Sequence, residues 1–139
     1  MTAPRLSTAA QSDRKPTAID ETHLGRMTLG DRRLEQEVLE LFLRQTTIML
    51  DRIVGADPPL AAAAAHTLKG SARGIGAWRV ARAAELLEQA AGGDSEGNGP
   101  GATARDLEEA TVELKAASLE ASAAIAARLT LLSKFGRER

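Results

Sequence analysis

The chain has 139 residues, a length typical of one domain with a single hydrophobic core. Hydrophobic residues make up 43% and charged residues 27%, as in folded globular proteins, but aromatic residues only 2%. Because β-sheets draw on aromatic and β-branched residues and this chain offers alanine and leucine instead, an all-α fold is predicted. The net charge of −1 argues against recruitment of nucleic acid or an anionic membrane. The absence of cysteine excludes disulfides, thiolate metal sites and cysteine nucleophiles.

No segment of the sequence resembles a membrane span or a secretory signal. The longest alanine-rich apolar run, residues 60–65, is far too short to cross a bilayer. No apolar stretch separates the N-terminal basic residues from a cleavage site. We therefore expect a cytoplasmic protein.

The first third of the chain is predicted to hold a tail and one long helix. Residues 1–17 are rich in Ser, Thr, Ala, Pro and charge without periodicity, and are predicted to be a flexible tail. A domain of residues 18–134 begins with a segment, 19–24, that could form one or two helical turns. The first long helix is predicted from its N-cap Asp31 to about Val54. Its inward face is marked, at spacings of three and four, by Leu34, Val38, Leu41, Gln45, Ile48 and Arg52, widened by Phe42, Met49 and Ile53.

Three further helices are predicted. The second runs from Pro58 to about Arg73, with Asp57 as N-cap, and the third covers about 77–91. The third helix turns Val80, Ala84, Leu87 and Ala91 inward. A glycine-rich flexible loop, 92–101, precedes the last helix, about 103–134, and residues 135–139 form a C-terminal tail. The last helix carries on one stripe Leu107, Thr111, Leu114, Ser118, Ala121, Ile125, Leu129 and Leu132. Four amphipathic helices with mostly short connections predict an antiparallel four-helix bundle with a short extra N-terminal helix.

Most signatures of enzymes and of ligand sites are absent. The glycines of Gly74-Ile75-Gly76 follow a helix rather than a strand, so they are no dinucleotide fingerprint. His23 and His66 lie far apart without a metal-binding spacing, and no serine-nucleophile motif occurs. The carboxylates of the first and last helices are interpreted as ordinary solvated faces. An enzyme with its own substrate pocket is therefore disfavoured, and no metal site is predicted.

One stretch, residues 65–76, combines a histidine with basic and small residues on one side of a helix. On a helical wheel of about 100° per residue, Leu68 and Ile75 lie opposite His66, together with Ala61 and Ala64. The residues within about 60° of His66 are Lys69, Gly70, Arg73, Ala62 and Ala63. His66 is therefore predicted to face solvent, and His23 is interpreted as a surface or packing residue.

The charge pattern supports an interaction surface around His66. From Pro58 to Ala84 the chain has no acidic residue, whereas Lys69, Arg73, Arg79 and Arg82 are present. A solvated basic face is the simplest explanation of such a run alone. Combined with an outward histidine, it indicates docking of an acidic or phosphorylated partner. Gly70 costs roughly 0.5–1 kcal/mol relative to alanine inside a helix, and its missing side chain would let a partner approach His66 closely.

The motif His66-Thr67-Leu68-Lys69-Gly70-Ser71-Ala72, with Gly76 ten positions after the histidine, resembles the signature of histidine phosphotransfer (Hpt) domains. The resemblance covers roughly residues 19–132, although the loop before the last helix is longer than a tight turn. It implies a four-helix bundle that relays phosphoryl groups in bacterial two-component phosphorelays. The histidine would accept the group from a receiver-domain aspartyl phosphate and pass it to another receiver.

By this resemblance, the phosphoacceptor is His66 and the cation that balances phosphate charge is Lys69. The partner-binding residues would be Gly70, Ser71, Arg73, Ala62 and Ala63. Mg²⁺ is expected on the receiver, so this chain is expected to bind no cofactor. Free imidazole is largely neutral and nucleophilic at neutral pH without a base. Since phosphoryl transfer needs mainly positioning and charge neutralisation, the lack of a nearby carboxylate in the sequence is no objection.

Two other functions stay open at this point. A non-catalytic receiver-binding bundle would not need the trio His66, Lys69 and Gly70. The phosphoacceptor part of a histidine kinase is disfavoured by Thr67 in place of an acidic residue and by the absence of anything like an ATP-binding domain. The expected partners are receiver domains of response regulators or of a hybrid histidine kinase, with no nucleic acid and no membrane. The compact bundle favours a monomer. The chain is expected to be a phosphoryl-group carrier rather than an enzyme with its own substrate pocket, and no autokinase activity is expected.

Overall fold

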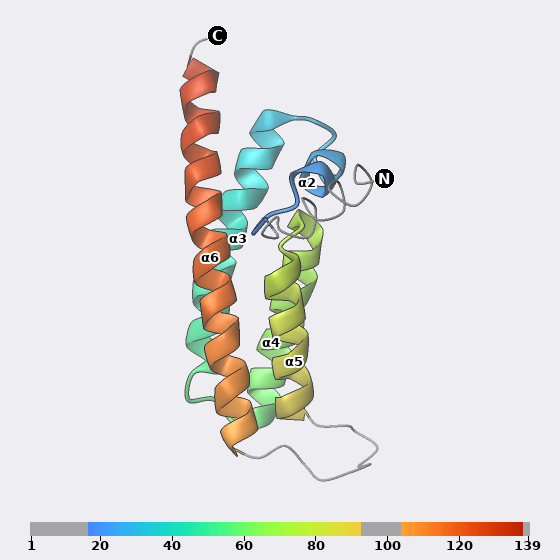
Figure 1. Ribbon diagram of the computed structural model, residues 1–139, viewed down its shortest axis with the longest axis vertical. Helices are drawn as coiled ribbons and strands as arrows, with labels where there is room; N and C mark the ends of the chain where they lie inside the picture. The colour runs from blue at the N-terminus through green and yellow to red at the C-terminus, as the bar shows by residue number, and fades with distance from the viewer. Residues whose placement is uncertain (1–16, 93–103, 138–139) are drawn as a thin grey trace, which may run out of the picture.

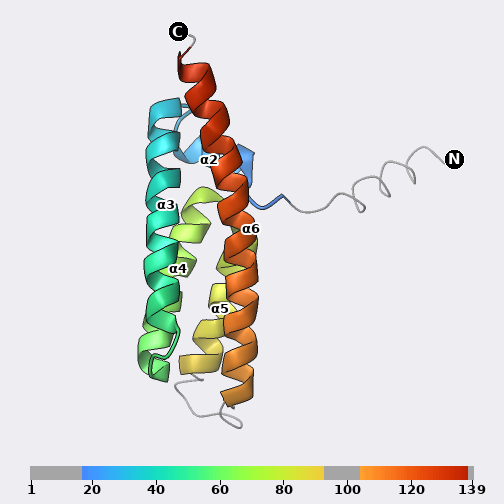
Figure 2. The same ribbon diagram turned by 90° about the vertical axis from the view of Figure 1, so that its left-hand side faces the viewer.

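The computed structural model describes residues 17–92 and 104–137, and in these ranges every regular element is an α-helix. The helices are α2 (Glu21–Met27), α3 (Arg32–Ile53), α4 (Pro58–Ile75), α5 (Trp78–Gly92) and α6 (Ala104–Arg137). Both α3 and α5 pack against α4 and against α6, so the four long helices surround one core (Figures 1 and 2). The short helix α2 packs against α4 at one end. The predicted all-α class is confirmed, while nearly all of the N-terminal tail and of the glycine-rich loop lies outside the described residues.

The helix ends follow local sequence signals. Asp31 caps α3, because its carboxylate accepts the backbone N–H groups of Arg33 and Leu34 at 2.9 and 3.1 Å. Helix α4 begins at Pro58 as predicted and continues past the predicted end to Ile75. It stops at Gly76, whose φ of +81° lies in the left-handed region that favours glycine. Helix α6 runs to Arg137, slightly beyond the predicted helix end at residue 134.

The buried faces of α4, α5 and α6 agree with the predicted ones. In α4 the buried residues include Ala61, Ala64, Leu68 and Ile75, and in α5 they include Val80, Ala84 and Leu87. Those of α6 include Leu114, Ser118, Ala121 and Ile125. Each fully buried leucine contributes roughly 1.5–3 kcal/mol through the hydrophobic effect. Most of the α4 and α5 core residues are alanine, which lets these two helices approach closely.

The prediction for the first long helix was wrong about the centre of its inward face. The buried residues of α3 are Glu35, Leu39, Phe42, Thr46, Met49 and Ile53. The predicted central residues Leu34, Leu41 and Ile48 are instead 37%, 48% and 48% exposed. Apolar residues cover a wide arc of α3, and the part of the arc that is buried depends on where α4 and α6 lie.

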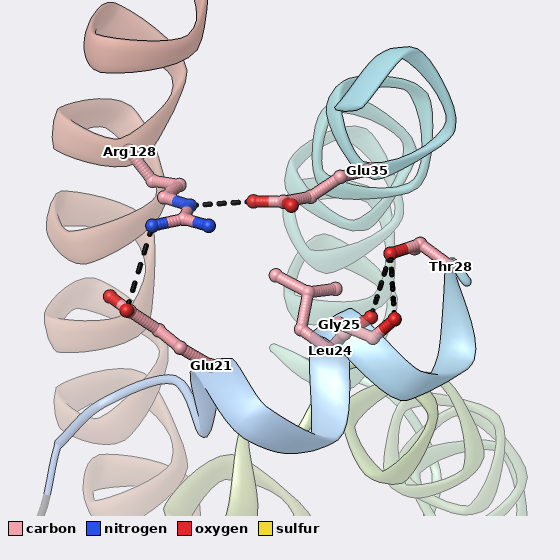
Figure 3. A network of polar contacts seen from close by, with 6 residues as sticks. All are labelled: Glu21, Leu24, Gly25, Thr28, Glu35 and Arg128. Carbon is pink, nitrogen blue, oxygen red and sulfur yellow. Dashed lines mark hydrogen bonds and ion pairs between the residues drawn. The ribbon is translucent and has the colours of Figure 1, made fainter. Parts of the chain in front are cut away.

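Two ion pairs that share Arg128 of α6 join this helix to α3 and α2 (Figure 3). The carboxylate of Glu35 is almost fully buried and accepts a hydrogen bond from Nε of Arg128, whose Nη1 lies 3.5 Å from Glu21. Hydrogen bonding to Glu35 raises the pKa of the Arg128 guanidinium against the opposing effect of burial. Glu35 is thus not the solvated carboxylate that the sequence suggested, because its partner lies far along the chain on α6.

The segment before α2 crosses the turn between α4 and α5. The Asp20 N–H donates to the Gly76 carbonyl at 2.9 Å, and Trp78 Nε1 donates to the Asp20 carboxylate at 2.9 Å. The Trp78 hydrogen bond is the main reason that the pKa of Asp20 is lowered. His23 lies 4.9 Å from the Trp78 ring, and its Nε2 donates to the Arg73 carbonyl at 2.9 Å. His23 is therefore a packing residue at the α2–α4 junction.

Candidate functional site

His66 lies near the middle of α4 and faces solvent. Its side chain is 67% exposed, whereas Leu68 on the opposite side of the helix is fully buried. The outward orientation expected from the helical wheel is confirmed.

A carboxylate from the neighbouring helix contacts His66. Nδ1 of His66 lies 2.8 Å from Oε2 of Glu88 on α5, and Nζ of Lys69 lies 2.8 Å from the other oxygen, Oε1. The Lys69 side chain is only 15% exposed. Glu88 therefore links the imidazole and the ammonium, and Lys69 is held against this carboxylate rather than extended into solvent.

These contacts determine which ring nitrogen of His66 is nucleophilic. Hydrogen bonds from Lys69 and, more weakly, from His66 hold the pKa of Glu88 below its usual range, although burial opposes them. An ionised carboxylate only accepts hydrogen bonds, so Nδ1 carries the proton. In a neutral imidazole the lone pair then lies on Nε2. The lone pair of Nε2 is thus free to attack an incoming electrophile.

Glu88 was not predicted as a neighbour of His66, because the two residues are far apart along the chain. The short turn between α4 and α5 folds the two helices against each other, and His66 and Glu88 are equally far from Ala77. Ala62 and Gly92 are likewise equally far from Ala77 along the chain. They also lie close together, since a Cβ on Gly92 would be 3.5 Å from the Cβ of Ala62. A carboxylate as far after the α4–α5 turn as His66 lies before it is the signal in the sequence that points to Glu88.

The structure brings most of the predicted partner-binding residues onto the side of α4 around His66. Gly70 is exposed, and a Cβ built there would meet nothing within 4 Å. Ala63 and Arg73 are also exposed, and Arg73 lies 3.8 Å from Glu85 of α5. Ser71 is different, because its hydroxyl turns toward α3 and donates to Gln45 at 2.6 Å. Ala62 is half-buried beside α5.

An apolar surface flanks His66 on the side of α3. Gln45 bonds to α4, so its neighbours on the same face of α3, Leu41 and Ile48, also lie beside α4. Both are exposed, as is Leu60 at the start of α4. A shallow groove between the two helices is lined by Met49, Arg52, Leu60, Ala63, Ala64 and Thr67. We call Leu41, Ile48, Leu60 and Ala63 the α3–α4 apolar patch.

Within the described ranges, no group of three potential metal-ligating side chains occurs. Nor does any helix there combine the length and hydrophobicity that crossing a bilayer demands. The site consists of the exposed imidazole of His66, the carboxylate of Glu88 and the ammonium of Lys69, beside the α3–α4 apolar patch.

Comparison with known proteins agrees with the motif around His66. Residues 37–133 match the family model of the Hpt domain, whereas no curated protein matches the sequence. A solved structure from rice, described as a histidine-containing phosphotransfer protein, superimposes with a TM-score of 0.68 at 16% identity. That match covers 93% of this chain and 89% of the rice chain, and at this identity it shows the fold alone. The family model spans well over half of the sequence, so the chain belongs to the Hpt domain family, whose members interact with receiver domains and transfer phosphoryl groups in phosphorelays.

Proposed function

We propose that His66 is the residue that carries the phosphoryl group. Nε2 attacks the phosphorus of an aspartyl phosphate on a receiver domain, forming the N–P bond as the bond to the aspartyl oxygen breaks. The aspartate leaves as a carboxylate with the electron pair. The reverse step on a second receiver completes the relay. The hydrogen bond between His66 and Glu88 supports this assignment most directly, because it leaves Nε2 as an exposed nucleophile.

Glu88 and Lys69 have complementary parts in this step. When Nε2 forms a bond to phosphorus, the ring becomes positively charged, and the Glu88 carboxylate beside Nδ1 stabilises that charge. Lys69 lies one helical turn from His66 and offsets charge on the incoming phosphoryl group. It also keeps Glu88 ionised through their 2.8 Å contact.

The receiver is proposed to dock over His66. Gly70 and Ala63 leave room for its loops, and the α3–α4 apolar patch supplies surface to bury. Arg73 lies at the edge and attracts an acidic partner, while Ser71 and Ala62 border the contact. The receiver supplies Mg²⁺ and its own acidic cluster, so this chain needs no cofactor.

The domain is proposed to be an antiparallel four-helix bundle of α3 to α6 with α2 as an additional short helix. It acts in the cytoplasm as a phosphoryl carrier without autokinase activity. Its receivers belong to response regulators or to a hybrid kinase.

Incubation with phosphorylated receivers tests the proposal. Acid-labile, base-stable label is expected on the wild type, and none on His66→Gln. His23→Gln is the matched control, because it changes the other histidine while an amide can still donate to the Arg73 carbonyl; it should be labelled normally. Label on His66→Gln would contradict the assignment. A wild type that binds receivers without label would instead be a docking module.

A further inference from the structure

Helix α6 is apolar on two opposite faces. Its inner face, with Leu114, Ala121 and Ile125, is buried in the core. A second set of apolar and small residues is exposed along the helix: Val112, Ala116, Leu119, Ala123, Ala126 and Thr130. We call this set the outer stripe. Thr130 fits it because its hydroxyl donates to the Ala126 carbonyl at 3.0 Å, which leaves its methyl group for packing.

The geometry of the outer stripe is that of a helix-pairing seam. At about 100° per residue its members lie within about 40° of one line, directly opposite the buried Ala121. Their spacings alternate between four and three residues, the repeat by which two helices stay in contact over several turns. A helix at the surface of a monomer needs only one apolar face. Here Val112 and Leu119 are 59% and 71% exposed, so the fold of one chain does not account for them.

We propose that the outer stripe binds the outer stripe of a second copy of this chain, with the two α6 helices antiparallel about a two-fold axis that passes between the two stripes at the level of residue 121 along the helix. In this register each large residue meets a small one, with Val112 opposite Thr130 and Leu119 opposite Ala123 of the other copy. Small residues along the stripe let the helix axes come close. Such large-to-small alternation is what interdigitating layers require.

The charges at the two ends of the stripe favour this partner and this direction. Glu108 lies four residues before Val112, and Lys134 lies four residues after Thr130; both are exposed. An antiparallel pair brings Glu108 of each copy beside Lys134 of the other. A parallel pair would bring like charges together at both ends, at a cost to stability.

The proposed dimer leaves the phosphotransfer site accessible. Helix α6 packs against α3 and α5, which also hold α4, so α4 and α6 lie across the bundle from each other (Figure 1). The outer stripe therefore faces away from His66, and a dimer presents two acceptor histidines on opposite sides. The proposed dimer stands in place of the monomer expected from the sequence. Its formation does not depend on the proposed function.

Sedimentation equilibrium on the full chain tests the interface. The wild type is expected to pass from 14.7 kDa to twice that mass as concentration rises to the millimolar range. Leu119→Gln should raise the dimer dissociation constant at least about ten-fold, which is a loss of about 1.4 kcal/mol. The control is Met27→Gln, which changes an exposed apolar residue of α2 and should leave the dimer dissociation constant unchanged. A wild type that stays monomeric, or an unchanged constant for Leu119→Gln at unchanged helicity, would overturn the proposal.

The absence of cysteine allows the direction of pairing to be tested separately. Val112→Cys and Thr130→Cys proteins, mixed and oxidised, should form a disulfide-linked dimer, while each protein alone should form little. Efficient crosslinking of Val112→Cys with itself would rule out the antiparallel register. Labelling of Leu119→Gln by phosphorylated receivers should equal that of wild type. If no protein is labelled yet dimers form, the proposed function fails and the interface stands.

Discussion

The imidazole of His66 and the carboxylate of Glu88 meet at 2.8 Å across the α4–α5 hairpin, although 22 residues separate them along the chain. The contact assigns the proton to Nδ1 and the lone pair to Nε2. It also explains why Lys69 is not free, since this ammonium binds the second oxygen of the same carboxylate. One carboxylate on α5 therefore contacts two side chains of α4, and under the proposed function this arrangement prepares Nε2 for attack.

Replacing Glu88 is expected to slow phosphoryl transfer without unfolding the domain. Glu88→Gln keeps a hydrogen-bond acceptor for Nδ1 but loses the charge that stabilises the phosphorylated ring. Charged hydrogen bonds contribute roughly 1 kcal/mol more than neutral ones, so the transfer rate should fall about five- to ten-fold. The transfer rate of Glu88→Ala should fall further, because this variant also loses the hydrogen-bond acceptor for Nδ1. Phosphotransfer time courses measure both effects, and an unchanged rate for Glu88→Ala would remove Glu88 from the mechanism.

Lys69→Ala should slow transfer and shorten the lifetime of the phosphohistidine, because no cation one turn away would offset the phosphate. Arg73→Ala should act mainly on receiver affinity, and its effect should disappear at high salt, since exposed charges are screened. Rates and lifetimes measured at low and high salt separate the two roles. Equal transfer rates and phosphohistidine lifetimes for wild type and both variants at low salt would contradict these roles of Lys69 and Arg73.

Gly70 distinguishes docking from packing. A Cβ at this position meets nothing within 4 Å, so Gly70→Ala should raise the melting temperature by about 1–4 °C through helix propensity. Gly70→Gln should stay folded, but its side chain would occupy the space of the receiver loops. Transfer should fall sharply for the glutamine variant and modestly for alanine. A glutamine variant that transfers at the wild-type rate would show that Gly70 lies outside the docking surface.

Gly76→Ala should destabilise the domain. Its φ is +81°, and a Cβ would lie 2.9 Å from both the Cβ and the carbonyl oxygen of Asp20. The backbone conformation alone costs about 1–2 kcal/mol for alanine, and the clash adds to it. Gly74→Ala is the matched control, because Gly74 is helical and a Cβ there meets nothing within 4 Å. Thermal melts should show a lower midpoint for Gly76→Ala alone, and equal midpoints would refute the close approach of Asp20.

The pH dependence of stability should report the Glu88 contacts. The pKa of Glu88 is lower in the folded protein than the ordinary value of 4.5, so its ion pairs stabilise the fold above that pH. The stabilisation is lost as pH falls through the lowered pKa of the folded state. The melting-temperature difference between wild type and Glu88→Gln should therefore shrink as the pH falls below 4.5. A difference that does not depend on pH would mean that Glu88 contributes through packing only.

Local patterns in the sequence determined the helices and the orientation of His66. Asp31 marks the start of α3 because its side chain accepts hydrogen bonds from free backbone N–H groups. Pro58 marks the start of α4 because proline has no N–H group that needs a partner. The wheel that opposes Leu68 to His66 depends only on the helical repeat within one helix. These features involve neighbours in the chain, so the residues themselves carry the information.

Contacts between helices were decided only by the tertiary structure. The buried face of α3, the pairing of Glu35 with Arg128 and the contact of Glu88 with His66 each depend on how two helices are placed relative to each other. Composition and periodicity describe one helix at a time and leave its rotation open when apolar residues cover a wide arc, as in α3. The placement of His66 on the surface could therefore be predicted, whereas the Glu88 carboxylate that contacts its Nδ1 became visible only once α5 folded back against α4.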